Sequence, residues 1–145
     1  MFGSLFESKH QKLIHKWQEE HKEIEKLAEK VIESYEKNEH NEAKKSMKAL
    51  KDIAVEHLMD EDIKLFNIIK EESDKLDTQT KALLNDFTSE FKHTKVSLMN
   101  FLAKYASPEV ALDRSFYRTF KELMDILAQR ISFEESNLYS RLKNN

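Results

Sequence analysis

A histidine and a glutamate four residues apart, His57 and Glu61, lie in the segment EHLMDED at 56–62. Residues at this spacing project from the same face of a helix, one turn from each other. The surrounding sequence, LKDIAVEHLMDEDIKLFNII at 50–69, carries its apolar residues at helical spacing. An imidazole and a carboxylate that face a helical interior form a typical ligand pair for iron, manganese or zinc. The pair therefore indicates a metal site, although this spacing alone is a weak signal.

A second segment, QRISFEES at 129–136, repeats the pattern with one change. When the two segments are aligned, Glu134 stands opposite Glu61 and Arg130 stands opposite His57. Arginine keeps its proton in proteins and is a poor metal ligand. The second segment therefore contributes one carboxylate and one guanidinium where the first contributes a carboxylate and an imidazole.

The two remaining apolar-striped segments also repeat each other. With His21 and Phe91 as origins, apolar residues recur at the same offsets, except that Thr94 stands opposite Ile24. Phe91 stands where His21 stands, and its ring cannot coordinate a metal. At about 100° per residue, five polar residues fall within or beside their apolar stripes. These residues are His21, His57, Glu61, Arg130 and Glu134.

Four long segments with apolar residues at three- and four-residue steps must position these side chains. The predicted helices are 5–37, 41–71, 78–105 and 108–143. The last has the clearest start signal, because Ser107 offers a hydroxyl cap, Pro108 suits the first turn and Glu109 complements the helix dipole. Short connections make consecutive helices antiparallel, which predicts an all-α, up-down-up-down four-helix bundle.

Length and composition agree with one helical domain over residues 1–145. One glycine, one proline and 35% charged residues favour helices over sheets. The formal net charge of −3 at pH 7, with both signs spread along the chain, argues against a nucleic-acid partner. The absence of cysteine excludes disulfides and thiolate metal sites. No signal-like start or membrane-length apolar run is found, so we expect a cytoplasmic protein without membrane contact.

The repeated pattern resembles the hemerythrin-like, or HHE cation-binding, family over nearly the whole chain. The similar segments are EEHKEIEKL at 19–27, HLMDEDIKLF at 57–66 and RISFEESNLY at 130–139. The resemblance implies a four-helix bundle in which each half supplies two histidines and one glutamate to a non-haem di-iron pair, with the carboxylates bridging the metals. The first half keeps His21, His57 and Glu61. The second half keeps Glu134 alone.

The favoured hypothesis is a single metal ion, iron first, with manganese or zinc as alternatives. Its four ligands would be His21, His57, Glu61 and Glu134. Two buried carboxylates repel each other and lack solvation, so a positive charge must accompany them unless one is protonated. Arg130 is expected to occupy the space of the second ion and to pair with both carboxylates through its planar fork.

Two other hypotheses about the metal stay open. In the one ranked second, the bundle holds no metal, Arg130 forms a buried network with the carboxylates, and the histidines are satisfied by hydrogen bonds. In the one ranked third, His93 turns inward on a π-bulge and restores a di-metal site. An ideal helix points His93 about 160° away from Phe91, which is why this hypothesis ranks last.

Three functions are compatible with the pattern. The first is metal-dependent sensing or handling of dioxygen, nitric oxide or peroxide. Oxygen carriage is disfavoured, because in the resembled family it takes one electron from each of two irons. The second is an enzyme that activates oxygen or peroxide, with Arg130 stabilising negative charge. The third is a metal-free adaptor that binds a protein partner or a second copy through its outer faces or through Phe2, Leu5 and Phe6.

Overall fold

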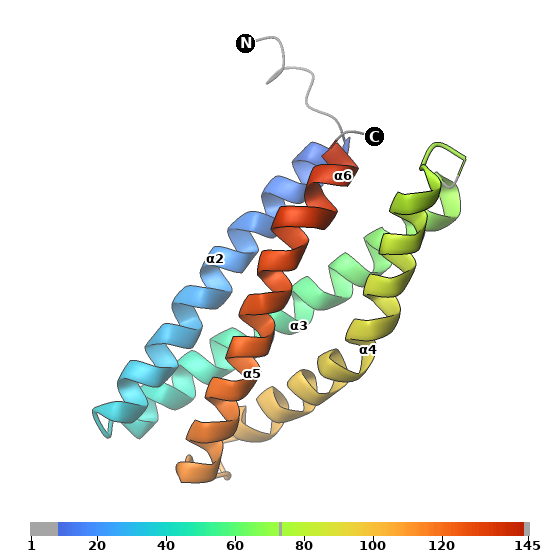
Figure 1. The fold of residues 1–145 in the computed structure, drawn as a ribbon. Helices are drawn as coiled ribbons and strands as arrows, with labels where there is room; N and C mark the ends of the chain where they lie inside the picture. The colour runs from blue at the N-terminus through green and yellow to red at the C-terminus, as the bar shows by residue number, and fades with distance from the viewer. Residues whose placement is uncertain (1–8, 73, 144–145) are drawn as a thin grey trace, which may run out of the picture.

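The computed structural model describes residues 9–72 and 74–143, which form four long helices and, in this part of the chain, no strand (Figure 1). The first three helices are α2 (Lys9–Glu36), α3 (His40–Glu71) and α4 (Thr78–Ala106). The fourth is a continuous run of α5 (Arg114–Phe133), the π-helical turn η1 (Glu134–Leu138) and α6 (Tyr139–Lys143). Short connections make consecutive helices antiparallel. The predicted all-α, up-down-up-down four-helix bundle is therefore confirmed.

The first residues of the chain lie outside this description. Phe2, Leu5 and Phe6, which the sequence offers as a partner-binding end, are among them, as is the predicted start of the first helix at residue 5. None of the described helices has both the length and the apolar character that crossing a lipid bilayer requires.

Two clusters of apolar side chains make up the interior of the bundle. The largest fully buried members of the first cluster are Met47, Leu50, Leu98, Leu102, Phe116 and Phe120. The second cluster surrounds Trp17 near the start of α2, and its other fully buried members are Ile14, Leu65, Leu84, Leu138 and Tyr139. Burial of each such side chain contributes about 1.5–3 kcal/mol. Along α2, α3 and the fourth helix, the inward polar residues come between members of the two clusters, so a polar layer crosses the bundle.

The fourth helix begins later than the sequence predicts. Ser107 is the C-cap of α4, with the extended backbone that the residue before a proline prefers. The N-cap of α5 is Asp113, whose carboxylate accepts a hydrogen bond from the backbone N–H of Phe116 at 2.8 Å. The predicted start at Pro108 is wrong because the chain first turns to bury Leu112, which is 5% exposed, in the first cluster.

Removal of the Asp113 cap should therefore weaken the fold. We expect Asp113→Ala to lower the free energy of unfolding by about 1 kcal/mol, the usual cost of losing an N-cap acceptor. Chemical denaturation of both proteins in the presence of a chelator measures the difference. Ser107→Ala is the matched control and should change the stability little. A larger loss in the Ser107 variant would contradict this assignment of the cap.

Candidate metal centre

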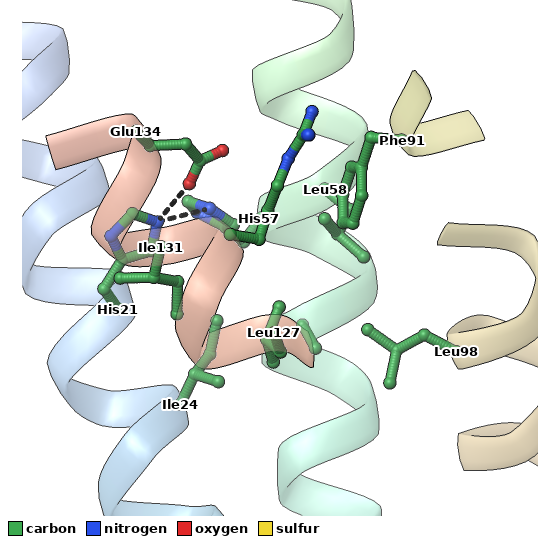
Figure 2. A pocket seen from close by; sticks show the side chains of 11 residues that line it. His21, Ile24, His57, Leu58, Phe91, Leu98, Leu127, Ile131 and Glu134 are labelled. Carbon is green, nitrogen blue, oxygen red and sulfur yellow. Dashed lines mark hydrogen bonds and ion pairs between the residues drawn. The ribbon is translucent and has the colours of Figure 1, made fainter. Parts of the chain in front are cut away.

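Four buried side chains meet in the polar layer between the two clusters. Figure 2 shows His21, His57 and Glu134 of this group. His21 comes from α2, His57 and Glu61 come from α3, and Glu134 opens the π-helical turn η1. Each of the four is at most 3% exposed, and one donor atom from each lies within 4.8 Å of the others. The structure therefore brings together the four residues that the sequence proposes as ligands.

The separations between the donor atoms fit a single central ion. The Nε2 atom of His21 lies 3.1 Å from Nε2 of His57 and 3.2 Å from Oε1 of Glu134. Nε2 of His57 lies 3.3 Å from Oε2 of Glu61. Two ligand atoms bonded to one ion at about 2.1 Å, at angles between a right angle and a tetrahedral angle, lie about 3.0–3.4 Å apart. The two imidazoles and two carboxylates thus have the spacing and the chemistry of a first-row metal site.

Two further carboxylates contact the outer nitrogens of the imidazoles. Oε1 of Glu20 lies 2.7 Å from Nδ1 of His57, and Oε1 of Glu135 lies 3.4 Å from Nδ1 of His21. A carboxylate at Nδ1 favours a proton on that nitrogen, which leaves the Nε2 lone pair of a neutral ring directed inward. Figure 2 shows these rings with Nε2 of His21 directed at His57 and Glu134. The sequence analysis missed both outer carboxylates, since Glu20 adjoins His21 in the chain but contacts the histidine of another helix.

The protonation of the cluster reflects the closeness of its two carboxyl groups. Burial raises the pKa of Glu134 well above its usual value, and the charge of Glu61 raises it further. Burial also raises the pKa of Glu61, but hydrogen bonds with Glu134 and His57 outweigh this effect, so its pKa is lowered. One proton on Glu134 therefore relieves the repulsion within the pair. A divalent cation would relieve it in the same way and would displace that proton.

The pKa values of the two imidazoles also shift in opposite directions. Burial lowers the pKa of His21, and the neighbouring charge of His57 lowers it further. Burial also lowers the pKa of His57, but the hydrogen bonds and charges of Glu61 and Glu20 outweigh it, so the pKa of His57 is raised. His21 is thus the neutral ring of the pair. Its free lone pair suits metal binding without prior loss of a proton.

Arg130 does not pair with the carboxylates as predicted. Its guanidinium carbon lies 3.2 Å from the ring centroid of Phe87 and 4.1 Å from that of Phe91, and its Nη2 donates to the backbone oxygen of Phe87 at 2.7 Å. The carboxyl groups of Glu61 and Glu134 instead lie beside the imidazoles of His57 and His21, at 3.3 and 3.2 Å. The bidentate prediction is wrong because the two aromatic faces and a carbonyl of α4 draw the cation toward that helix. Burial lowers the pKa of Arg130 to about 10, so the group remains charged at neutral pH.

His93 stays away from the cluster. Helix α4 is α-helical throughout, and the side chain of His93 is exposed on it. Phe91, two residues earlier, is buried at 6% exposure. His93 would need a π-helical turn in α4 to face inward, whereas the π-helical turn of the described structure lies in η1, on the fourth helix. The restored second half-site is therefore not formed.

The sequence analysis also missed Tyr139, at the start of α6. This side chain is 1% exposed, and its hydroxyl donates to Oε2 of Glu61 at 3.3 Å. Burial and the charges of Glu61 and Glu134 raise the pKa of Tyr139, so its hydroxyl is neutral. The alignment of the two halves places Tyr139 opposite Phe66, which is 61% exposed. That alignment assumes a regular helix and so hides the inward position of Tyr139.

A narrow cavity adjoins the cluster. Its volume of about 10 Å³ is enough for one water-sized molecule. Its polar end is formed by His21, His57, Arg130 and Glu134. The apolar lining comprises Ile24, Ala54, Leu58, Phe91, Leu98, Leu127 and Ile131. A ligand of about the size of water could therefore reach the donor atoms, whereas a larger one would need movement of the surrounding side chains or helices.

A comparison of the chain with models of protein families found a match. The family model described as "Hemerythrin HHE cation binding domain" matches residues 12–142, which is most of the chain. The matched region contains all four donor residues and every described helix apart from the outermost residues of the first and the last. No curated protein and no solved structure matches the chain significantly.

The outer carboxylate on His57 should strengthen cation binding. We expect Glu20→Gln to weaken the affinity for zinc(II) by about 10–100-fold, because the imidazole loses the partner that orients it and raises its basicity. Competition with a chromogenic chelator measures the affinity. Glu19→Gln is the matched control, since Glu19 is exposed and pairs with Lys22. Equal affinities in the two variants would contradict the role assigned to Glu20.

Proposed function

Because the chain belongs to the hemerythrin HHE cation-binding family, we propose that it binds one non-haem iron ion and senses or handles a small ligand there. The ligands of the metal are His21, His57, Glu61 and Glu134. The observation that carries this proposal is the placement of these four donors within 4.8 Å of one another in a buried layer. Two imidazoles and two carboxylates suit iron(II), with manganese(II) and zinc(II) as alternatives.

The second half of the bundle supports one ion over two. Phe91 has no donor atom where the first half has a histidine, and Arg130 places a positive charge beside it. A second cation would meet this charge at a position that offers few ligands. The guanidinium lies between two aromatic rings, which hold it there.

The chain's own residues prepare the site for a small ligand. Glu20 and Glu135 orient the imidazoles, and the apolar lining of the cavity keeps bulk water away. The Nε atom of Arg130 is buried and has no hydrogen-bond partner among the described residues. A ligand that carries or gains negative charge in the cavity would satisfy this donor. Bound iron supplies an open coordination position and one-electron chemistry.

We favour dioxygen, nitric oxide or peroxide as the ligand, since each is small and can accept electron density from iron. A cytoplasmic location is part of this proposal. Catalytic turnover of peroxide would make the protein an enzyme, and reversible binding without turnover would make it a sensor or binding module.

The metal content of the protein tests the first part of the proposal. Protein reconstituted anaerobically with iron(II) should hold about one iron per chain by elemental analysis, and His57→Ala should lose it because an inward donor is removed. His93→Ala is the matched control, as this histidine is exposed, and should keep the metal. A content of two ions per chain would contradict the single site. Protein that holds no iron would contradict iron binding.

Nitric oxide tests the second part. Added without air to the iron(II) protein, it should change the visible and electron paramagnetic resonance spectra, with saturation at one molecule per iron. The reason is that a cavity beside the donors gives a small ligand a path to the proposed ion. The His57→Ala variant, treated identically, should show no such change. Iron-loaded protein whose spectra do not respond would contradict a small-ligand site while leaving iron binding intact.

A further inference from the structure

Tyr139 reaches into the donor cluster from the start of α6. Its hydroxyl oxygen lies 3.3 Å from Oε2 of Glu61 and 3.4 Å from Nε2 of His21. These distances match those among the four donors themselves, which begin at 3.1 Å. The oxygen also lies in the buried layer, because the side chain is 1% exposed. Tyr139 therefore contacts two of the four proposed ligands of the metal ion.

Four donor atoms form a closed ring in space. Around the ring, His21 to His57 is 3.1 Å, His57 to Glu61 is 3.3 Å, Glu61 to Tyr139 is 3.3 Å, and Tyr139 to His21 is 3.4 Å. Adjacent ligands of one ion with bonds of about 2.1 Å have separations of about 3.0–3.4 Å. Glu134 adds a further donor 3.2 Å from His21. The tyrosine oxygen thus has the place of a ligand beside the histidines and glutamates.

The π-helical turn explains how two residues of one helix reach this site. Glu134 and Tyr139 are five residues apart, which in a regular α-helix places them about 140° apart around the axis. In η1 the backbone N–H of Tyr139 donates to the oxygen of Glu134, so the wider turn brings both onto one face. Helix α3 provides the comparison within the chain: Glu61 and Phe66 have the same spacing in α-helix, and Phe66 is 61% exposed.

Neighbouring rings hold the phenol in this orientation. The ring of Tyr139 stacks on that of His21, with centroids 6.0 Å apart and an interplanar angle of 12°. On another side it contacts Trp17, with centroids 5.8 Å apart. Trp17 is itself anchored, since its Nε1 donates to Asp60 at 3.1 Å. The hydroxyl is therefore held at the cluster by packing as well as by its hydrogen bond.

We propose that Tyr139 is a fifth protein ligand of the iron and binds it as a phenolate. This inference rests on the proposed iron site. The oxygen–iron bond replaces the O–H bond, and the proton now shared with Glu61 leaves to solvent. A hard, anionic oxygen ligand favours the iron(III) state. Five protein ligands would still leave room on the ion for one small ligand.

Phenolate bound to iron(III) absorbs visible light through charge transfer from the ring to the metal, which gives a direct test. Protein loaded with iron(II) and then oxidised in air should show this band, and Tyr139→Phe with a measured iron content should lose it. Tyr105→Phe is the matched control, because Tyr105 is a buried ring of the first cluster, and it should keep the band.

A second measurement does not depend on the folding of the variant. Resonance Raman spectra of the wild-type protein, excited in the band, should show phenolate ring modes that shift when the protein is grown with ring-deuterated tyrosine. Iron-loaded wild-type protein without the band, or with a band that Tyr139→Phe retains, overturns the ligand assignment and leaves the iron site standing. Wild-type protein that takes up no iron overturns both proposals.

Discussion

The structure depends on the contact between two carboxyl groups, those of Glu61 and Glu134, in the dry middle of a helix bundle. Two adjacent negative charges without solvent are strongly unfavourable, so a proton, a hydrogen-bond donor or a cation must offset their repulsion. One carboxyl holds a proton, and both pair with imidazoles at 3.2–3.3 Å. A divalent cation satisfies the same requirement with greater charge. The match to a cation-binding family agrees with the physical needs of this pair.

The rest of the bundle holds that pair in place. The polar layer lies between two apolar clusters, so the helices are anchored on both sides of it and the donors cannot separate. Outer carboxylates orient the imidazoles from the far side of each ring. A buried polar network of this kind is rarely needed for stability, since apolar residues of similar volume would often serve as well or better. Its completeness therefore points to a function that needs those donors.

The two halves of the bundle have diverged in chemistry while they keep the same architecture. The first half presents imidazoles, whereas the second presents the aromatic rings of Phe87 and Phe91 with a guanidinium against them. An arginine that stacks on aromatic faces has no need of the central carboxylates, which leaves these free for an ion. The remaining space is a cavity for one small molecule beside the donors. The half that lacks the histidines thus contributes to a small cavity beside the donors.

The sequence by itself determined the bundle of four helices and the inward positions of His21, His57, Glu61 and Glu134, because helical periodicity reports which face of each segment is buried. Only the tertiary structure decided where Arg130 points and which carboxylate contacts His57, since both depend on contacts between helices. It also decided the later start of α5, because the chain buries Leu112 first. Above all it placed Tyr139 at the site: a π-helical turn departs from the regular spacing on which any comparison of helix faces relies.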